Sequence, residues 1–114
     1  MRIIAGKWKG HTLQTPKNNL TRPTSDRIRE ALFSALESRI ELNESHVLDL
    51  FAGTGALGLE ALSRGAGTCY FVEKMTAAWA VIENNIHALD AGDKTHLLKR
   101  DAVSYTHLTL PTKL

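Results

Sequence analysis

The segment DLFAGTGALGLEAL, residues 49–62, decides the fold because it joins a short apolar run to three closely spaced glycines. Gly53, Gly55 and Gly58 have the spacing G-x-G-x-x-G, which is typical of a nucleotide-binding turn between a strand and a helix. Gly53 and Gly55 would let the backbone approach a ligand, and Gly58 would let the helix pack closely on the strand. The segment therefore predicts a Rossmann-like α/β unit with its ligand at the turn.

The same alternation of strand and helix continues along the chain. We expect a strand at residues 46–50, a helix at 56–64, a strand at 68–73, a helix at 76–89 and a third strand within 95–102. The almost continuous apolar character of TCYFVE, residues 68–73, is typical of a parallel strand that is covered on both faces. The order predicts an α/β fold with a truncated parallel sheet.

Two further elements are expected upstream of the glycines. Residues 2–15 form short runs divided by Gly6 and Gly10, which predicts two short strands or a β-hairpin. A helix is expected from residue 25 onward, with Thr24 or Ser25 as N-cap and Asp26 in the first turn. Its apolar positions recur with helical spacing and predict the face that packs on the core: Ile28, Ala31, Leu32, Ala35 and Leu36.

The charge is uneven along the chain. Residues 1–29 contain seven basic residues and one acid, a charge of +6, so the remainder carries −4 of the net +2. A basic arm suits a polyanionic partner such as RNA, although a solvated hairpin that binds nothing has the same composition. Trp8 lies between Lys7 and Lys9, where it could stack on a base or anchor the arm to the body.

Several kinds of site are not expected. The single Cys69 is predicted to be a small buried side chain, and the five histidines are scattered without metal-ligand spacing. No stretch approaches the length of a membrane span and no signal peptide is evident, so we expect a cytoplasmic protein without a metal or membrane partner.

Asp49 distinguishes between the ligands that a glycine turn can hold. A like-charge contact between this carboxylate and a phosphate costs about 4 kcal/mol at about 4 Å and an effective dielectric constant of about 20. A cationic sulfonium or ammonium gains a similar amount, so charge favours S-adenosylmethionine over NAD. Glu73 follows the second strand, where an acid binds ribose hydroxyls, and Asp101 with Ala102 follows the third, near the place of an adenine. The alternatives to cofactor binding are that Asp49 is an acid that caps the turn, that Glu73 is a solvated acid at the end of a strand and that Asp101 is an acid in a surface loop.

Five segments together resemble the bacterial 16S ribosomal RNA guanine-N2 methyltransferases, class I enzymes that use S-adenosyl-L-methionine: MRIIAGKWKG, RPTSDRIREALFSAL, VLDLFAGTGALGLEALSRGA, FVEK and RDA. The resemblance covers about residues 1–105. It implies a class I methyltransferase fold with an N-terminal β-hairpin and helix, and methylation of a guanine N2 in 16S rRNA or the 30S subunit. By resemblance the cofactor-binding residues are Asp49, Phe51, Ala52, Gly53, Thr54, Gly55, Glu73, Asp101 and Ala102. The residues implied to hold RNA are Lys7, Trp8, Lys9, Arg22 and Arg27.

The resemblance stops near residue 105. Members of the family carry an Asn/Asp-Pro-Pro-aromatic motif that binds the target amine, and this sequence lacks it, so no catalytic residue is assigned and the chain is expected to be inactive alone. We divide the chain into a basic hairpin and loop (1–24), a partial cofactor-binding domain (25–105) and a non-native tail (106–114). A full-length form is expected to be a monomer, whereas the exposed sheet edge here would favour self-association. The alternatives are a non-catalytic cofactor- or RNA-binding fragment and, less favoured, an NAD-dependent oxidoreductase.

Overall fold

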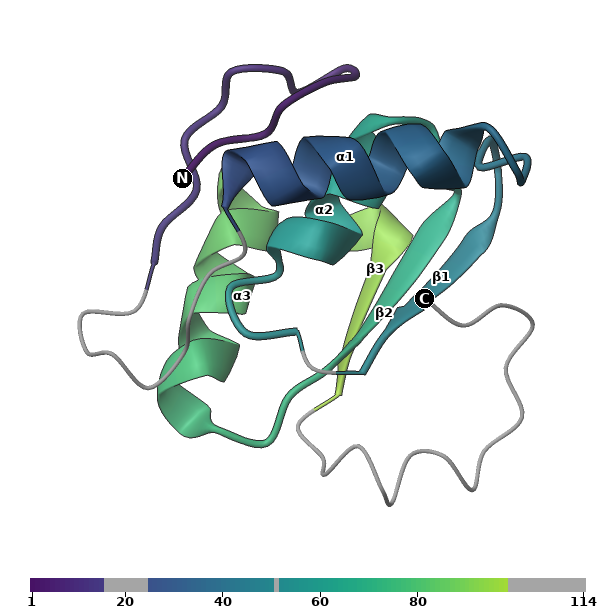
Figure 1. Cartoon of the computed structure of the whole chain (residues 1–114). Coiled ribbons are helices and arrows are strands. Elements are labelled where there is room, and N and C mark those ends of the chain that lie inside the picture. The colour runs from purple at the N-terminus through teal and green to yellow at the C-terminus, as the bar shows by residue number, and fades with distance from the viewer. Residues whose placement is uncertain (16–24, 51, 99–114) are drawn as a thin grey trace.

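The computed structural model describes residues 1–15, 25–50 and 52–98. Three strands form one sheet in the order β1-β2-β3, with β1 at His46–Asp49, β2 at Thr68–Val72 and β3 at Thr95–Leu98. The helices are α1 (Asp26–Glu37), α2 (Ala56–Ser63) and α3 (Thr76–Ala88), and a short 3-10 turn, η1 (Gly92–Lys94), precedes β3. Figure 1 shows this alternation of strands and helices, which confirms the predicted α/β order.

The strands are parallel and end at a common edge. Asp49 at the end of β1 is paired with Phe71, and Val72 at the end of β2 is paired with Leu98. In open parallel sheets, ligands bind outside this carboxyl edge, so the register brings the residues that follow each strand toward one site. Asp101 and Ala102, which were predicted to contribute from the third strand, lie outside the described residues, as do Arg22, Thr24 and the proposed tail.

Helices α2 and α3 pack where the sequence predicted. The expected inward residues of α3 are all buried: Ala78, Val81, Ile82, Ile86 and Leu89. Helix α2 lies on β2, and a Cβ atom placed on Gly58 would come within 2.3 Å of the Phe71 ring and 2.6 Å of the Cys69 sulfur. Both of these side chains are fully buried. Gly58 is therefore required for close approach of helix and strand, and the prediction that Cys69 is buried is confirmed.

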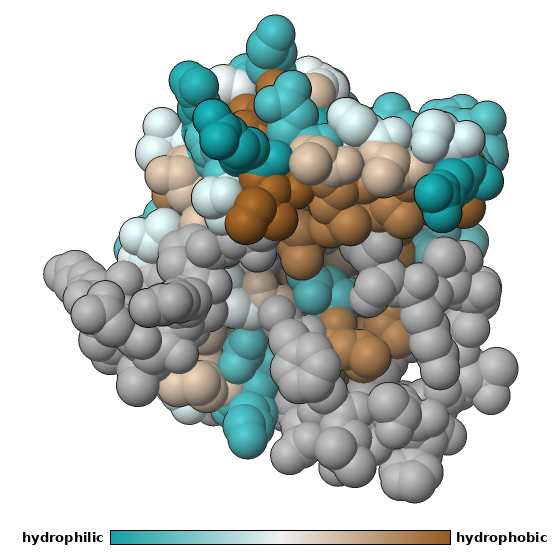
Figure 2. All heavy atoms as spheres, viewed as in Figure 1, coloured by the Kyte–Doolittle hydropathy of each residue, from teal (hydrophilic) through white to brown (hydrophobic). Residues whose placement is uncertain are grey.

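Helix α1 has the predicted start but not the predicted packing face. The Ser25 hydroxyl accepts a hydrogen bond from the Ile28 N–H at 3.3 Å, so Ser25 is the N-cap. Ile28 and Leu32, however, are 59% and 39% exposed, and Arg29 and Phe33 are buried instead. The predicted apolar face is wrong for Ile28 and Leu32, because Arg29 turns inward to a buried acid on α2, whereas Leu36 packs against the core as predicted. Figure 2 shows the apolar side chains that gather on this face of the molecule along α1.

Residues 1–14 form a hairpin-like arm. The Ile3 N–H donates to the His11 carbonyl at 2.9 Å and the Leu13 N–H to the Met1 carbonyl at 2.8 Å, around one antiparallel bridge between residues 2 and 12. Ile3 and Leu13 are buried and fix the arm to the body. The hairpin prediction is confirmed, with this one bridge in place of two strands. Within the described ranges, no helix has the length and apolarity needed to cross a bilayer.

Candidate functional site

The glycine turn between β1 and α2 has the left-handed backbone that its sequence predicts. Gly53 has φ 56° and Gly55 has φ 81°, a region that side-chain-bearing residues rarely adopt. Gly55 is the N-cap of α2, and its N–H donates to the Ala52 carbonyl at 2.7 Å. The turn thereby places residues 52–55 at the carboxyl edge of the sheet, where the predicted ligand would lie.

Glu73 crosses from the end of β2 to this turn. One carboxylate oxygen accepts the Gly53 N–H at 2.9 Å and the other accepts the Met75 N–H at 3.0 Å. The side chain is thus not a solvated strand-end acid, the alternative weighed from the sequence. A carboxylate has about four acceptor sites, so each oxygen keeps capacity for a further donor such as a hydroxyl.

Asp49, the last residue of β1, is only 6% exposed. Burial raises the pKa of the Cys69 thiol on β2 well above its usual value, and the nearby negative charge of Asp49 raises this pKa further. Asp49 and Glu73 thus give the carboxyl edge two acidic groups from neighbouring strands. A charge of this sign favours a cationic ligand group over a phosphate.

Four backbone N–H groups around the turn already have acceptors within the chain. Ala52 donates to the Val72 carbonyl at 3.3 Å, Gly53 to Glu73, Gly55 to Ala52, and Ala56 to the Thr54 hydroxyl at 3.3 Å. A dinucleotide turn uses such N–H groups to bind its diphosphate. The residues present therefore fit a cationic nucleoside with free ribose hydroxyls better than a diphosphate. Phe51, also predicted here, lies outside the described residues.

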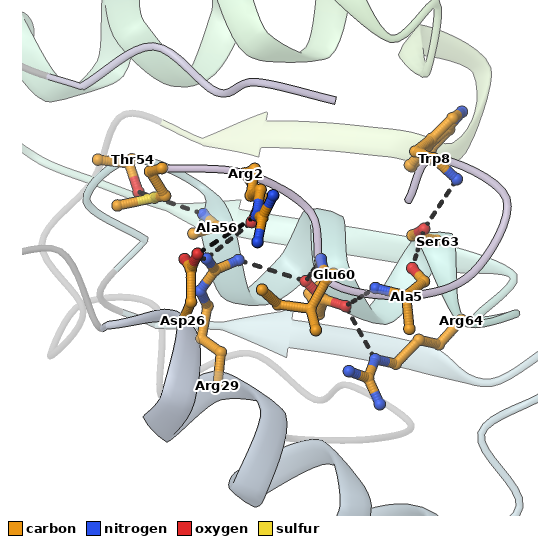
Figure 3. Close-up of polar contacts among 12 residues, drawn as sticks. Arg2, Ala5, Trp8, Asp26, Arg29, Thr54, Ala56, Glu60, Ser63 and Arg64 are labelled. Carbon is orange, nitrogen blue, oxygen red and sulfur yellow. Dashed lines mark hydrogen bonds and ion pairs between the residues drawn. The ribbon is translucent and has the colours of Figure 1, made fainter. Parts of the chain in front are cut away.

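The basic arm is docked on α2, the helix that begins at the glycine turn. The Glu60 carboxylate accepts the Ile4 N–H at 2.9 Å and the Ala5 N–H at 3.1 Å, and the Ser63 hydroxyl accepts the Trp8 N–H at 3.0 Å (Figure 3). Gly6 lies against Ser63 so closely that a Cβ atom would meet its carbonyl oxygen at 1.9 Å. Helix α2 therefore connects the cofactor turn to the arm.

A buried ion network surrounds the same carboxylate. Arg29 Nη1 lies 3.2 Å and Arg64 Nε lies 2.9 Å from Glu60, and the side chains of Arg29 and Glu60 are both fully buried. Arg29 also pairs with Asp26 and donates to the Arg2 carbonyl at 2.7 Å (Figure 3). The positive charge of Arg29 is thus neutralised by acids of the same chain. Sequence reasoning missed Glu60, whose only signal was a charged residue among the apolar positions of α2.

Three of the predicted RNA-binding residues, Lys7, Lys9 and Arg27, are exposed. Trp8 is partly buried and packs against the core, and Lys7 Nζ lies 4.6 Å from the centroid of its ring. These are the contacts of an anchor, while stacking of Trp8 on a base stays a prediction. The neighbouring Lys94 on η1 lowers the pKa of Lys7 and Asp93 opposes this effect, so η1 brings to the arm a further cation, which sequence reasoning missed, together with an acid.

The comparisons with known proteins agree with this geometry. The family model described as "Conserved hypothetical protein 95" matches residues 1–112. The chain belongs to this family. Ribosomal RNA small subunit methyltransferase D of Escherichia coli (strain K12) is 41% identical over 105 residues, which cover 92% of this chain and 52% of that protein. The same protein of Haemophilus influenzae is 42% identical over 89 residues, which cover 78% of this chain and 45% of the other.

Solved structures show the fold of this family member. "Putative methyltransferase yhhF" from Escherichia coli superposes with a TM-score of 0.79 at 38% identity, over 92% of this chain and 55% of that one. The C-terminal domain of precorrin-6Y C5,15-methyltransferase from Rhodobacter capsulatus has a TM-score of 0.69 at 18% identity, covers 88% of this chain and 56% of its own, and bears on the fold alone. The chain thus has the Rossmann-like fold of class I methyltransferases, and it spans about half the length of the relatives that it matches.

Proposed function

We propose that the chain is the cofactor-binding half of an enzyme that transfers a methyl group from S-adenosyl-L-methionine to the N2 of a guanine in 16S ribosomal RNA. The proposal is supported by the relatives, which are named as small-subunit rRNA methyltransferases. The guanine N2 specificity rests on the sequence resemblance. The cofactor supplies an activated methyl on its sulfonium, so the protein has to bind and orient rather than form a covalent intermediate.

The observation that carries the proposal is the hydrogen bond between Glu73 and the Gly53 N–H, at 2.9 Å. It supports a single site formed by the end of β2 and the glycine turn, and the buried acid Asp49 at the same edge disfavours a diphosphate and with it the NAD-dependent oxidoreductase. Glu73 would accept the ribose hydroxyls, Asp49 would face the methionine ammonium and sulfonium, and the turn at 52–55 would approach the methionine part. Phe51, Asp101 and Ala102 complete the proposed cofactor site by resemblance.

On the RNA side, the exposed Lys7, Lys9 and Arg27 would bind phosphates, with Lys94 adding to the same charge. Trp8 and Arg22 belong to this proposed surface by resemblance. Because the arm is docked on the helix that starts at the cofactor turn, RNA bound on the arm would lie at a fixed position relative to the methyl donor. The substrate would be 16S rRNA or the 30S subunit, without a metal.

A second candidate is a cofactor- and RNA-binding chain that does not catalyse transfer by itself. The sequence has no Asn/Asp-Pro-Pro-aromatic motif to orient the guanine amine, a weak nucleophile that needs positioned acceptors. For the 114 residues as they stand, we infer binding of both ligands without turnover.

The test is methyl transfer from tritiated S-adenosylmethionine to 30S particles. The chain alone is compared with a full-length version that continues it to the length of its relatives. We expect label in 16S rRNA, at a guanine N2 after nucleoside digestion, only from the full-length version. No label in RNA from that version would remove the methyltransferase proposal, and label from the chain alone would refute the non-catalytic candidate.

A further inference from the structure

Asn85 on α3 joins the arm to the glycine turn through a single side-chain amide. Its nitrogen donates to the Thr54 carbonyl at 3.0 Å and to the Gln14 carbonyl at 3.0 Å, and its oxygen accepts the Gln14 N–H at 2.7 Å. The side chain is 3% exposed. Both hydrogens of the amide nitrogen are therefore committed, one to the cofactor turn and one to the arm.

These bonds matter because they join groups that are far apart in sequence. Thr54 is 3% exposed, and a buried carbonyl without a donor costs about 1–3 kcal/mol, so the turn depends on Asn85 for its present conformation. The backbone N–H and carbonyl of Gln14 are both hydrogen-bonded to the side-chain amide of Asn85. The first half of the arm is thus held by α2, and the second half by Asn85.

A second contact links the same two parts. The Thr54 hydroxyl donates to the Met1 sulfur at 3.7 Å, and the Met1 carbonyl accepts the Leu13 N–H next to Gln14. A change at the turn therefore reaches the arm by two routes. Asn85 is the buried one, and it is the one whose geometry is fixed by a planar group with three hydrogen bonds.

We propose that Asn85 couples the two ligands, so that cofactor bound at the turn increases the affinity of the arm for RNA and RNA increases the affinity for cofactor. Asn85 is a positioning residue in this scheme, and the scheme rests on the proposed function. The two states are the arm docked on Asn85 and the arm released from it. Each ligand favours the docked state, because the turn that holds cofactor and the arm that holds RNA have their described geometry only there.

The expected size follows from typical couplings between sites, which correspond to about 5–150-fold in affinity. We expect a saturating amount of S-adenosylhomocysteine to tighten binding of 16S rRNA by about fivefold or more. Linkage requires saturating RNA to tighten S-adenosylhomocysteine binding by the same factor.

The experiment measures both dissociation constants, each with and without the other ligand, for the whole chain and three variants. Asn85→Ala removes all three hydrogen bonds, and Gln14→Pro replaces an exposed residue and removes only the backbone N–H that the Asn85 oxygen accepts, together with the Gln14 side chain. Asn84→Ala is the matched control, because Asn84 is the adjacent residue of the same type and its side chain donates to the Gln14 side chain, at 3.1 Å, rather than to the turn or to the backbone of the arm. The coupling factor is the dissociation constant of one ligand alone divided by its dissociation constant with the other ligand saturating. This factor should fall toward one in Asn85→Ala and Gln14→Pro and stay at the wild-type value in Asn84→Ala.

The outcomes separate the coupling from the function. If both ligands bind the wild-type chain independently, with a factor of one, the coupling is refuted and the proposed function stands. The same holds if Asn85→Ala and Gln14→Pro keep the wild-type factor. If 16S rRNA or S-adenosylhomocysteine does not bind at all, the proposed function and the coupling both fail. A loss of stability alone would lower the active fraction but would not change the ratio of the dissociation constants.

Discussion

Replacing Glu60 with glutamine tests the junction between the arm, α1 and α2. The carboxylate accepts two backbone N–H groups and two guanidinium groups, from Arg29 and Arg64. In Glu60→Gln, one oxygen becomes an NH2 group that faces donors, and the buried Arg29 loses its charged partner on α2 while it keeps Asp26. Breaking one side of a buried ion pair costs about 3–5 kcal/mol, a large part of the 5–15 kcal/mol that stabilises a typical domain.

Urea unfolding followed by circular dichroism measures this loss. With a slope of about 2 kcal/mol per M, a loss of about 3–5 kcal/mol lowers the midpoint by about 1.5–2.5 M. Hydrogen exchange gives a local readout, since either the Ile4 or the Ala5 amide loses its acceptor and should exchange faster than in the wild-type chain. Glu30→Gln is the control, because Glu30 is an exposed acid on α1.

The reasoning is refuted if the midpoint of Glu60→Gln lies within about 0.25 M of that control, which corresponds to the ±0.5 kcal/mol of an ordinary surface change. Unchanged exchange at Ile4 and Ala5 would separately contradict the docking of the arm on Glu60.

Three further predictions concern packing, pH and RNA. Gly58→Ala should gain about 1 kcal/mol of helix propensity but destabilise the fold by a net 1–2 kcal/mol or so, since the new methyl group meets Phe71. Adding Phe71→Leu should restore part of this loss. Equal or higher stability of Gly58→Ala in thermal melts would contradict the prediction. Because the pKa of Cys69 is raised in the folded state, the unfolded thiol ionises first, and stability should fall above about pH 9 by up to about 1.4 kcal/mol per pH unit. Cys69→Ala should lack this component, and identical pH profiles would count against it. Reversing charge at Lys7 and Lys9 to Glu should weaken RNA binding and flatten its salt dependence without changing cofactor affinity, and an unchanged salt slope would exclude these lysines from the interface.

The local part of the fold was predictable from the sequence. The glycine spacing predicts the turn, and the apolar runs of α2, α3 and β2 predict which residues are buried, because in these elements burial follows hydrophobicity. The Ser25 cap is predictable because the N–H group that it caps, that of Ile28, lies only three residues away. Asp49 and Glu73 could be placed at one edge because parallel strands end together.

What could not be predicted depends on partners that are distant in sequence. Arg29 displaces the apolar stripe of α1 from the core because Glu60, 31 residues away, neutralises it there. Asn85 is buried because Gln14, 71 residues away, satisfies its amide. Hydrophobic periodicity treats a buried arginine or asparagine as polar and assigns it to the surface. It therefore misplaces Arg29 and Asn85, which connect the arm to the rest of the fold.

The most direct measurement of the central claim is calorimetric titration of the chain with S-adenosylhomocysteine and, separately, with NADH. The acidic edge formed by Asp49 and Glu73 should bind the first at one site and show no heat with the second. Asp49→Ala should weaken the first by about 2–4 kcal/mol, as expected when a charged contact loses its partner. Binding of NADH with a stoichiometry of one, or unchanged S-adenosylhomocysteine affinity in Asp49→Ala, would contradict the account.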